Sequence, residues 1–460
     1  MDVIDLFDTA TRREKTAAGI EKYRKGEMKI CVKGENGDAI RGAKLKITQK
    51  SHEFKFGVNL FLLDEMESAE KNEMYKKNLS DVFNMGVVPI YWDALEPVRG
   101  NPRFSKNSER IYRRPPVDTC IEFCKENNIE PKAHCLNFDV FTPEWVRKLS
   151  AKEHKIALEE RMCALAEKYA DKIPCWEVIN ETLIDNGKTP LYYDKDVVGW
   201  SFDTARKYFP RNELIINENA QNVYPGYAHN RSQYYMQIER ELARGRQIDG
   251  IGFRAHFMFG EAFRQNYANP AFLDEFFDTY SEFGLPLQLT EVTIPAVFGV
   301  YDGKTFEERT AIDEGKQAAM LGRLYEYYFS LERAEAIIYW NLTDGYAYQA
   351  EPGDMAAGEN VWRGGLVDFD GRRKPAYEVL NTLVNKTWRT QANVSSDKDG
   401  AAHIRGFFGE YEIEAEIPAD GGANVGTNGG TNGGAGGIKR KKFAVNFSKK
   451  EAEKEIILQF

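Results

Sequence analysis

The sequence predicts an α/β protein in which a (β/α)8 TIM barrel is inserted into a small discontinuous β-sandwich. Two observations predict the barrel: eight apolar, strand-like segments lie between residues 54 and 388, and helical segments alternate with them. Eight such strand–helix units are what a closed barrel requires. The sandwich is predicted by short segments of alternating polarity near both ends of the chain, because an isolated hairpin is barely stable and needs partner strands.

The N-terminal part is predicted to begin with a helical segment at residues 1–26, which contains one helix from Thr9 to Arg24. Residues 28–33 and 40–48 then alternate between apolar and polar side chains, and the turn between them indicates a hairpin. We expect these strands to join a C-terminal group in one sandwich made of residues 27–53 and 389–460. The predicted C-terminal strands are residues 402–407, 409–417, 442–447 and 455–458.

The terminal segments also share a glycine pattern with known modules. It resembles the pattern of transthyretin-like and carboxypeptidase-regulatory-like β-sandwiches. Residues 421–437 are rich in Gly, Asn and Thr and are predicted to form a loop, because such a composition cannot pack a core. The basic run at residues 439–442 is interpreted as a solvated hairpin arm, with a polyanion-binding patch as the alternative. The positions that carry the resemblance are Gly37, Gly42, Ala43, Asp397, Gly400, Gly409 and Tyr411.

The barrel, residues 54–388, is predicted from strands rich in β-branched and aromatic residues and from explicit helix start signals. Residues 142–143, Thr-Pro, are typical of an N-cap followed by proline in the first turn. Ser150 with Glu153, and Thr305 with Glu308, are capping boxes. The predicted strands are residues 54–60, 87–92, 130–137, 174–180, 213–217, 247–254, 286–290 and 336–340.

The composition narrows the function. A net charge of −9 argues against nucleic acid as a partner, and no apolar run is long enough for a membrane helix. The six cysteines form no metal-ligand spacing with histidines, so we expect reduced thiols, no metal and no cofactor. Since the N-terminus does not resemble a secretory signal, we expect a cytoplasmic protein, or a secreted one if a leader has been removed. The oligomeric state stays open.

Two predicted strands end in a glutamate. Residues 174–180 run directly into Glu181, and residues 286–290 run into Glu291. Because the active site of such a barrel lies at the carboxyl ends of its strands, the two side chains are expected to face each other there. Most glutamates near strand ends are solvated or salt-bridged, but a pair at one rim is the arrangement that acid–base chemistry on a sugar requires.

The other strand ends carry amides, imidazoles and aromatic rings. Sugar hydroxyls need donors and acceptors in pairs, and the C–H face of a pyranose stacks on aromatic rings. The strand ends therefore predict a carbohydrate site, in which two carboxylates provide an acid/base and a nucleophile. The strand-end groups are Tyr91, Trp92, Asp93, His134, Asn137, Asp139, Asn180, Asn217, Glu218, Asn219, Arg254, His256, Trp340 and Asn341.

Seven motifs, in order along the barrel, are similar to those of glycoside hydrolase family 10, the xylanase family. YWDALEP at residues 91–97 matches "K-W-D-x-x-E-P", and WEVINE at residues 176–181 matches "W-D-V-V-N-E". DGIGFRAH at residues 249–256 matches "D-G-[IV]-G-x-Q-x-H", and LTEVT at residues 289–293 matches "I-T-E-L-D". The remaining matches are AHCLNFD with PEW at residues 133–139 and 143–145, WNLTDGYAY at residues 340–348, and KPAY at residues 374–377.

This resemblance implies a retaining O-glycosyl hydrolase, similar to endo-1,4-β-xylanases, that acts by double displacement. Glu181 would be the acid/base and Glu291 the nucleophile. The substrate-binding residues that the resemblance implies are Asn180 on the 2-hydroxyl of the sugar in subsite −1, His134 on the same sugar, His256 on the nucleophile and Trp340 as the floor.

The chain also departs from the family pattern, chiefly around the neighbouring subsite −2. We therefore expect a β-linked pentoside or hexoside, xylan- or xyloside-like, bound through an altered subsite −2. An exo-acting β-glycosidase on small plant glycosides and a catalytically silent carbohydrate-binding barrel stay open. A metal-dependent hydrolase is disfavoured by six scattered histidines. The departures are Tyr91 for lysine, Val88 for asparagine, Arg254 for glutamine, Asp139 for histidine and Tyr348 for tryptophan.

Overall fold

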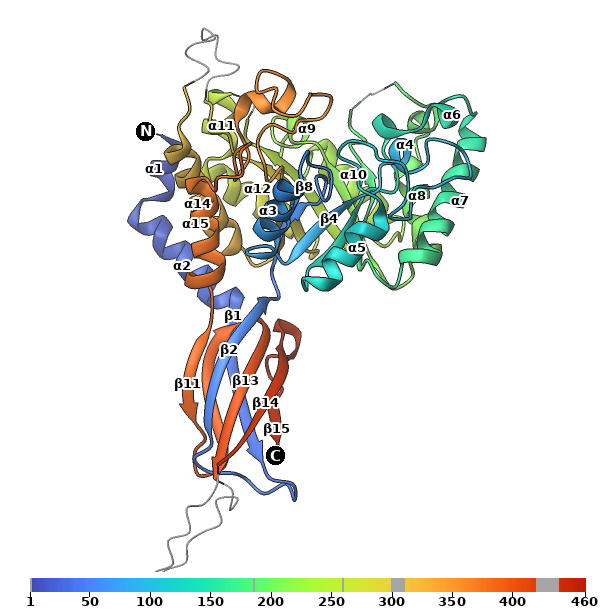
Figure 1. The fold of residues 1–460 in the computed structure, drawn as a ribbon. Helices are drawn as coiled ribbons and strands as arrows, with labels where there is room; N and C mark the ends of the chain where they lie inside the picture. Colours follow the sequence, from blue (N-terminus) through green and yellow to red (C-terminus); the bar gives the residue numbers. More distant parts are fainter. Residues whose placement is uncertain (1, 185–186, 259, 299–310, 419–437) are drawn as a thin grey trace, which may run out of the picture. The chain divides into compact units, whose positions relative to one another are not determined.

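The computed structural model describes residues 2–184, 187–258, 260–298, 311–418 and 438–460. It divides into two compact units (Figure 1). The first unit contains Met1–Arg13, Lys55–Tyr328 and Arg333–Asn381, and the second contains Glu14–Phe54, Phe329–Glu332 and Thr382–Phe460. The expected helix start at residues 305–308 and the expected loop at residues 421–437 lie outside the described residues.

The first unit is built on a closed barrel of eight parallel strands, in the order β10-β3-β4-β5-β6-β7-β8-β9. Helices surround the barrel (Figure 1), so the (β/α)8 prediction is confirmed. Most of the strands are rich in apolar residues because both faces of a parallel sheet are covered, whereas β5 carries Glu130, Lys132 and His134. Their bounds are β3 Lys55–Asn59, β4 Met85–Pro89, β5 Glu130–His134, β6 Cys175–Asn180, β7 Glu213–Glu218, β8 Gly250–His256, β9 Leu287–Thr293 and β10 Ala334–Tyr339.

The longer α-helices run between the strands, and shorter helices lie in the connections. The longer ones are α2 Ala10–Arg24, α3 Ala69–Ser80, α5 Val117–Glu126, α7 Ala151–Tyr169, α8 Val197–Tyr208, α10 Gln233–Ala243, α12 Pro270–Ser281, α14 Glu314–Phe329 and α15 Pro375–Thr382. The shorter ones are α1 Val3–Phe7, α4 Trp92–Leu95, α6 Glu144–Arg147, α9 Ala220–Val223, α11 Glu261–Tyr267, η1 Asp139–Phe141, η2 Pro190–Tyr193, η3 Gly358–Trp362, η4 Leu383–Thr387 and η5 Lys449–Glu451.

Two of the expected helix starts can be compared with the structure. The capping box of α7 is present, with the Glu153 amide donating to Ser150 Oγ at 3.3 Å and the Ser150 amide donating to Glu153 Oε2 at 2.9 Å. The start at residues 142–143 is wrong by one residue. Pro143 is the N-cap of α6, and the Thr142 hydroxyl donates to the Phe138 carbonyl instead of capping the helix.

The strand predicted at residues 87–92 is displaced. β4 ends at Pro89, and the chain turns at once into the short helix α4. The Leu95 amide closes this turn onto the Tyr91 carbonyl at 2.8 Å, and Trp92 Nε1 donates to Glu96 Oε2 at 3.0 Å. A helical turn that begins directly after the strand places Tyr91 at the rim of the barrel, where its side chain is available to a site.

The second unit contains two sheets. One has the order β12-β1-β15 and the other β11-β2-β13-β14. Side chains from both sheets form one hydrophobic cluster, which includes Ile30, Ile47, Ile404, Ile413 and Leu458. The strand bounds are β1 Lys25–Lys33, β2 Lys44–His52, β11 Gln391–Ser395, β12 Ala401–Phe407, β13 Gly409–Pro418, β14 Ile438–Phe447 and β15 Ile456–Gln459.

The predicted hairpin between the first two strands is wrong. β1 pairs with β12 and β15, whereas β2 pairs with β11 and β13 in the other sheet. Residues 34–43 therefore cross from one sheet to the other. Alternating polarity shows which face of a strand is buried, but two strands of opposite sheets bury their apolar faces in the same core and give the same pattern.

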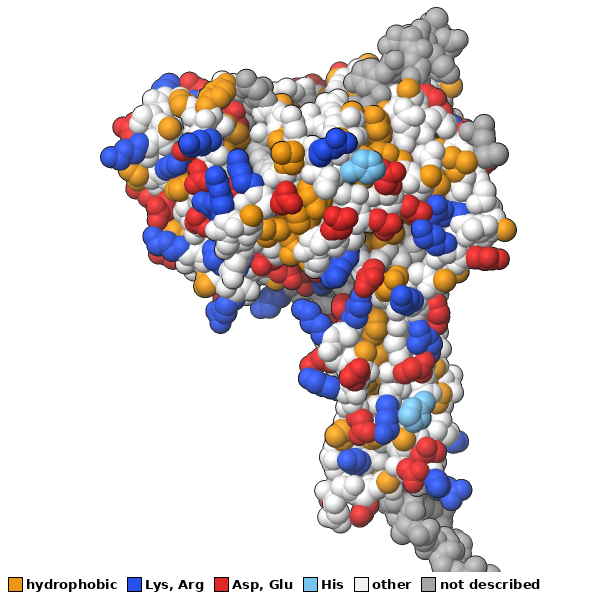
Figure 2. Space-filling model, turned by 180° about the vertical axis from the view of Figure 1, so that it is seen from behind, with side chains coloured by type: hydrophobic (Ala, Val, Ile, Leu, Met, Phe, Trp, Pro, Cys, Tyr) orange, Lys and Arg blue, Asp and Glu red, His pale blue; other side chains and the backbone are white. Residues whose placement is uncertain are grey.

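The basic run at residues 439–442 lies in β14, opposite acidic residues of β13. Arg440 Nε is 2.7 Å from Glu416 Oε1, and Lys442 Nζ is 2.9 Å from Glu414 Oε1. These cross-strand pairs partly neutralise the run, as the interpretation as a hairpin arm expects. Figure 2 shows basic and acidic side chains interleaved over the face of the molecule that it presents. None of the helices in the described residues combines the length and the apolar character that crossing a membrane requires.

Candidate active site

Glu181 lies immediately after β6, at the carboxyl end of the barrel strands, and its side chain is buried. Its φ of +53° is in the left-handed region, which costs a residue with a Cβ about 1–2 kcal/mol. The amide of Glu181 donates to the Asn217 carbonyl at 3.2 Å, and Asn219 Nδ2 donates to Glu181 Oε1 at 3.2 Å. Strand β7 therefore holds the strained backbone of Glu181, and Asn219, the residue after β7, holds its carboxylate.

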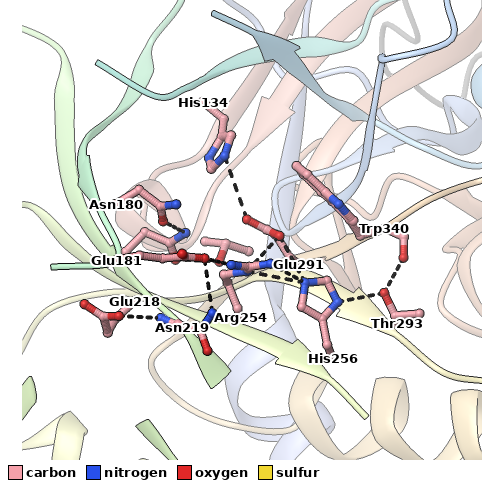
Figure 3. A network of polar contacts seen from close by, with 12 residues as sticks. His134, Asn180, Glu181, Glu218, Asn219, Arg254, His256, Glu291, Thr293 and Trp340 are labelled. Carbon is pink, nitrogen blue, oxygen red and sulfur yellow. Dashed lines mark hydrogen bonds and ion pairs between the residues drawn. The ribbon is translucent and has the colours of Figure 1, made fainter. Parts of the chain in front are cut away.

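Glu291 is the second strand-end glutamate, buried within β9 (Figure 3). Its Oε2 lies 2.9 Å from Arg254 Nε and 3.1 Å from His256 Nε2, and its Oε1 lies 3.9 Å from His134 Nε2. Burial by itself would raise the pKa of Glu291. The charge of Arg254 and the contacts with His256 and His134 outweigh burial and lower this pKa to about 2. Glu291 is therefore ionised at neutral pH.

Arg254 joins the two glutamates. Its Nη1 contacts Glu181 Oε1 while its Nε contacts Glu291 Oε2 (Figure 3). In the register of β8 with β9, Arg254 stands beside Glu291, so strand pairing fixes this neighbour relation. Since one guanidinium reaches both carboxylates, Glu181 and Glu291 meet at the same end of the barrel and flank one small space.

His256 completes the contacts of Glu291. The Thr293 hydroxyl donates its hydrogen to the Trp340 carbonyl. Its oxygen therefore accepts a hydrogen bond from His256 Nδ1, at 2.8 Å. This network assigns the proton of a neutral His256 to Nδ1. Nε2 then accepts from Arg254 Nη2 at 3.0 Å, and it can donate to Glu291 only when the ring is a cation.

Asn180 is held by a chain of amide and hydroxyl groups. Asn217 Nδ2 donates to Asn180 Oδ1 at 2.8 Å, and Thr290 Oγ1 donates to Asn217 Oδ1 at 2.6 Å. Asn217 fits because residue 252 is glycine, where a Cβ would lie 2.5 Å from Asn217 Oδ1. The buried Nδ2 of Asn180 has no hydrogen-bond partner among the described residues. A buried donor of this kind is suited to a ligand oxygen.

His134 is oriented from behind by a buried ion pair. Its Nδ1 lies 2.5 Å from Glu177 Oε2, and Lys132 Nζ lies 2.5 Å from Glu177 Oε1. Burial would raise the pKa of Glu177, but Lys132 and His134 lower it. The ionised Glu177 accepts a hydrogen bond from Nδ1 of His134. This bond directs Nε2 of His134 toward Glu291.

Aromatic rings form one wall of the site. The Tyr91 ring is 5.1 Å from the His134 ring and 4.3 Å from the Phe141 ring, measured between centroids. The buried Trp340 ring is 5.6 Å from His134. Tyr348 joins this wall through Phe141, at 5.5 Å, and is 44% exposed. The aromatic residues that the sequence predicted therefore form a continuous series from the buried carboxylates to the surface.

Arg114 is a residue of this wall that the sequence analysis missed. Its guanidinium carbon lies 4.1 Å from the Tyr91 ring centroid, 5.4 Å from that of Phe141 and 5.6 Å from that of Tyr348. Arg114 is buried and takes part in no ion pair within the described part of the chain. It lies in the long connection after α4, where the paired arginines before Pro115 were the one available signal.

Two other strand-end carboxylates hold loops rather than joining the pair. Glu218 Oε2 accepts from the amides of Thr182 and Leu183 at 2.8 and 3.1 Å, and burial raises the pKa of Glu218 to about 7. Asp139 accepts from the Lys188 amide at 3.1 Å and from the Thr189 hydroxyl at 2.7 Å. Both fix the segment that follows Glu181. In the ranges that the structure describes, no cluster of His, Cys, Asp and Glu could hold a metal ion.

The fold and the site define a barrel with paired acidic groups at the carboxyl ends of its strands. The family model for glycosyl hydrolase family 10 matches residues 48–383, and the chain belongs to this family. It is 25% identical over 415 residues to the anti-sigma-I factor RsgI6 of Acetivibrio thermocellus, covering 89% of this chain and 46% of the relative. It is 22% identical over 401 residues to endo-1,4-beta-xylanase 1 of Arabidopsis thaliana, covering 86% and 37%.

Among solved structures, native xylanase 10B from Thermotoga maritima matches with a TM-score of 0.56 and 21% identity, over 73% of this chain and 96% of that one. This likeness supports the barrel fold. The chain spans less than half the length of the two curated relatives named above.

Proposed function

We propose that this chain hydrolyses a β-linked glycoside with retention of anomeric configuration, with Glu291 as nucleophile and Glu181 as acid/base. The observation that carries the proposal is the contact of one guanidinium with both carboxylates, which brings two acidic groups within reach of a single anomeric carbon. Family membership supports the same chemistry. Retaining enzymes place their carboxyl groups about 5–5.5 Å apart.

In the first step, Glu291 attacks the anomeric carbon and forms a glycosyl ester. The bond from this carbon to the leaving oxygen breaks, and Glu181 gives that oxygen its proton. In the second step, Glu181 takes a proton from water, the water oxygen attacks the same carbon, and the ester bond to Glu291 breaks. The pKa of Glu291, near 2, keeps the nucleophile ionised throughout the neutral range.

The substrate is proposed to be a xylan- or xyloside-like pentoside or hexoside. Asn180 Nδ2, which has no partner within the described residues, would donate to the 2-hydroxyl of the sugar that is attacked. His134 would contact the same sugar, and Trp340 would support its ring. Tyr91 and Tyr348 would line the neighbouring subsite, where Tyr91 places an aromatic face in the position of the family's lysine.

The test compares wild type with Glu291→Ala and Glu181→Ala on aryl β-xylosides, aryl β-glucosides and xylan, with the product anomer followed by NMR. Wild type should release the β-anomer first, and Glu291→Ala should lose turnover by at least a thousandfold while still binding sugar. Glu73→Ala is the matched control, because Glu73 is an exposed carboxylate on α3. First release of the α-anomer would contradict the proposed double displacement.

A second candidate function, carbohydrate binding without turnover, is favoured by the same ion pairs. Arg254 contacts both carboxylates, and neither is free to act while the guanidinium stays there. The relative from Acetivibrio thermocellus is named as an anti-sigma factor. Calorimetric binding of xylo-oligosaccharides to wild type, with no product after prolonged incubation, would favour this candidate over hydrolysis.

A further inference from the structure

The side chain of Arg254 is held by three acceptors. Nη1 contacts Glu181 Oε1, Nε lies 2.9 Å from Glu291 Oε2, and Nη2 lies 3.0 Å from His256 Nε2. The side chain is 17% exposed, so it is partly open to solvent and is not part of the closed core. Each of its three nitrogen atoms therefore has a partner, and two of these partners belong to the proposed catalytic pair.

This arrangement conflicts with turnover. Double displacement needs a sugar carbon between the two carboxylates, and it needs a proton on Glu181 at the start. A guanidinium in contact with Glu181 favours the ionised carboxylate and occupies the space that the sugar must enter. Arg254 must therefore leave Glu181 when a substrate binds productively.

A neutral sugar offsets only part of the free energy that is lost when Arg254 gives up its ion pairs. Its hydroxyls replace two charge-assisted contacts with neutral hydrogen bonds, which are about half as strong. A carboxylate on the sugar offers the guanidinium an equivalent partner, because arginine and carboxylate form a planar pair with two parallel hydrogen bonds. The ion pair would then pass from the enzyme's carboxylate to that of the substrate.

A second cation on the same wall supports an acidic ligand. Arg114 is buried against Tyr91 and takes part in no ion pair among the described residues, although the Asp93 carboxylate is close enough to act on its charge. Its Nη1 donates to the Arg113 carbonyl at 3.0 Å. An unpaired buried charge is costly unless an opposite charge arrives. Its alternative role is packing alone, through stacking on aromatic rings.

We propose that Arg254 is a specificity-determining residue that makes the site selective for β-glycosides carrying a carboxylate, such as uronosyl-bearing substrates. Arg254 pairs with Glu181 and Glu291, and the substrate carboxylate draws the guanidinium away and leaves Glu181 free for the sugar. This inference rests on the proposed function and names its substrate class. Arg114 adds a second positive charge on the same wall, against Tyr91.

The experiment uses the full chain and two matched pairs of ligands. The first pair is 4-nitrophenyl β-D-glucuronide and 4-nitrophenyl β-D-glucoside, which differ by a carboxylate in place of a hydroxymethyl group. The second pair is β-1,4-xylo-oligosaccharides with and without a glucuronosyl branch. Both kcat/KM and calorimetric affinity are measured for wild type, Arg254→Gln, Arg254→Lys and Arg99→Gln. Arg99 is the control, because it also stacks on an aromatic ring, Trp145, but lies outside the site.

Wild type should prefer the acidic member of at least one pair by tenfold or more. Arg254→Gln should reduce that preference at least tenfold, because kcat/KM and affinity should fall for the acidic ligand and rise for the neutral one. Arg254→Lys should keep part of the preference, and Arg99→Gln should keep all of it. Circular dichroism of each variant establishes that it is folded. If Arg254→Gln does not fold, Arg254→Lys replaces it in the test.

Two outcomes separate this inference from the proposed function. If wild type binds acidic ligands selectively but cleaves no member of either pair, the proposed hydrolytic activity is wrong and the inference about Arg254 stands. If wild type binds and cleaves the neutral members at least as well as the acidic ones, and Arg254→Gln affects both equally, the inference about Arg254 is wrong. The proposed hydrolytic activity then stands.

Discussion

Nε of Arg254 lies 2.9 Å from Oε2 of Glu291, and the two residues stand side by side in the register of β8 and β9. Glu291 is buried and the Arg254 side chain is only 17% exposed, so water screens the charge of Arg254 at Glu291 only in part. Burial raises the pKa of Glu291, and Arg254 is the largest of the influences that lower it to about 2. The protonation of Glu291 should therefore respond directly to substitution of Arg254.

The first prediction concerns the acid limb of activity. In Arg254→Gln the pKa of Glu291 should rise by about 1 unit or more, which corresponds to about 1.4 kcal/mol. Because the ionised form of Glu291 is the proposed nucleophile, the acid limb of kcat/KM on a neutral glycoside should move to higher pH. A pH–rate profile of both proteins measures this shift, with Arg99→Gln as control. An acid limb that stays in place would show that Arg254 does not set the charge of Glu291.

The same pKa has a consequence for stability. The folded-state pKa of Glu291, about 2, is below the ordinary glutamate pKa of 4.5. Glu291 therefore stabilises the fold above about pH 4.5, and this contribution is lost as the pH falls from 4.5 toward 2. In Arg254→Gln the pH range over which this stability is lost should be narrower, because the folded-state pKa of Glu291 moves closer to 4.5. Urea unfolding of both proteins between pH 3 and 6 measures the free energy of unfolding that tests this.

The second prediction concerns the buried pair of Lys132 and Glu177. Lys132→Met leaves the Glu177 carboxylate buried without its cationic partner and should destabilise the protein by about 3–5 kcal/mol. His134 should also lose its fixed orientation, so activity should fall even where the protein remains folded. The matched control is Lys77→Met, which removes an exposed pair with Asp81 and should change stability by less than about 1 kcal/mol. Equal effects in urea unfolding would contradict the prediction.

The third prediction concerns Gly252. A Cβ at residue 252 would lie 2.5 Å from Asn217 Oδ1 and 2.8 Å from Thr290 Cγ2. Gly252→Ala should displace Asn217, and with it Asn180, lowering kcat/KM at least tenfold and stability by about 1–3 kcal/mol. Gly315→Ala is the control, because the added Cβ meets its nearest neighbour, Asp313 Oδ1, at an ordinary 3.4 Å. Normal activity in Gly252→Ala would exclude the proposed chain from Gly252 to Asn180.

The fourth prediction concerns Glu218. Burial raises its pKa in the folded protein to about 7, above the ordinary glutamate pKa of 4.5. Its contribution to stability is therefore fully present below about pH 4.5 and is lost as the pH rises toward 7, by up to about 3 kcal/mol. Glu218→Gln removes this titration, so its stability relative to wild type should increase between pH 5 and 7. Chemical unfolding at several pH values measures the trend, with Glu73→Gln as an exposed control.

The barrel could be predicted because parallel strands that are covered on both faces leave long apolar runs. All eight predicted barrel strands correspond to strands of the structure. The error at residues 87–92 arose because Tyr91 and Trp92 favour strands by composition, while a local helical turn sets their conformation. The false hairpin arose because alternation reports burial but does not identify the partner strand.

The site could be predicted as a set of residues, but its connections could not. The strand-end positions of Glu181 and Glu291 follow from sequence order alone. The contact of Arg254 with both requires the register of β8 with β9 and a side-chain direction, which one sequence does not contain. Arg114 comes from a long connection, where no periodic pattern relates a residue to the barrel rim.

The second unit takes its strands from both ends of the chain. β1, at Lys25–Lys33, is completed by β12, at Ala401–Phe407, and by β15 at Ile456–Gln459. During synthesis from the N-terminus, β1 and β2 stay without these partner strands until residues 391–459 have been made. Chains truncated within the barrel should therefore expose two orphan strands, which makes them natural targets for chaperones and proteases.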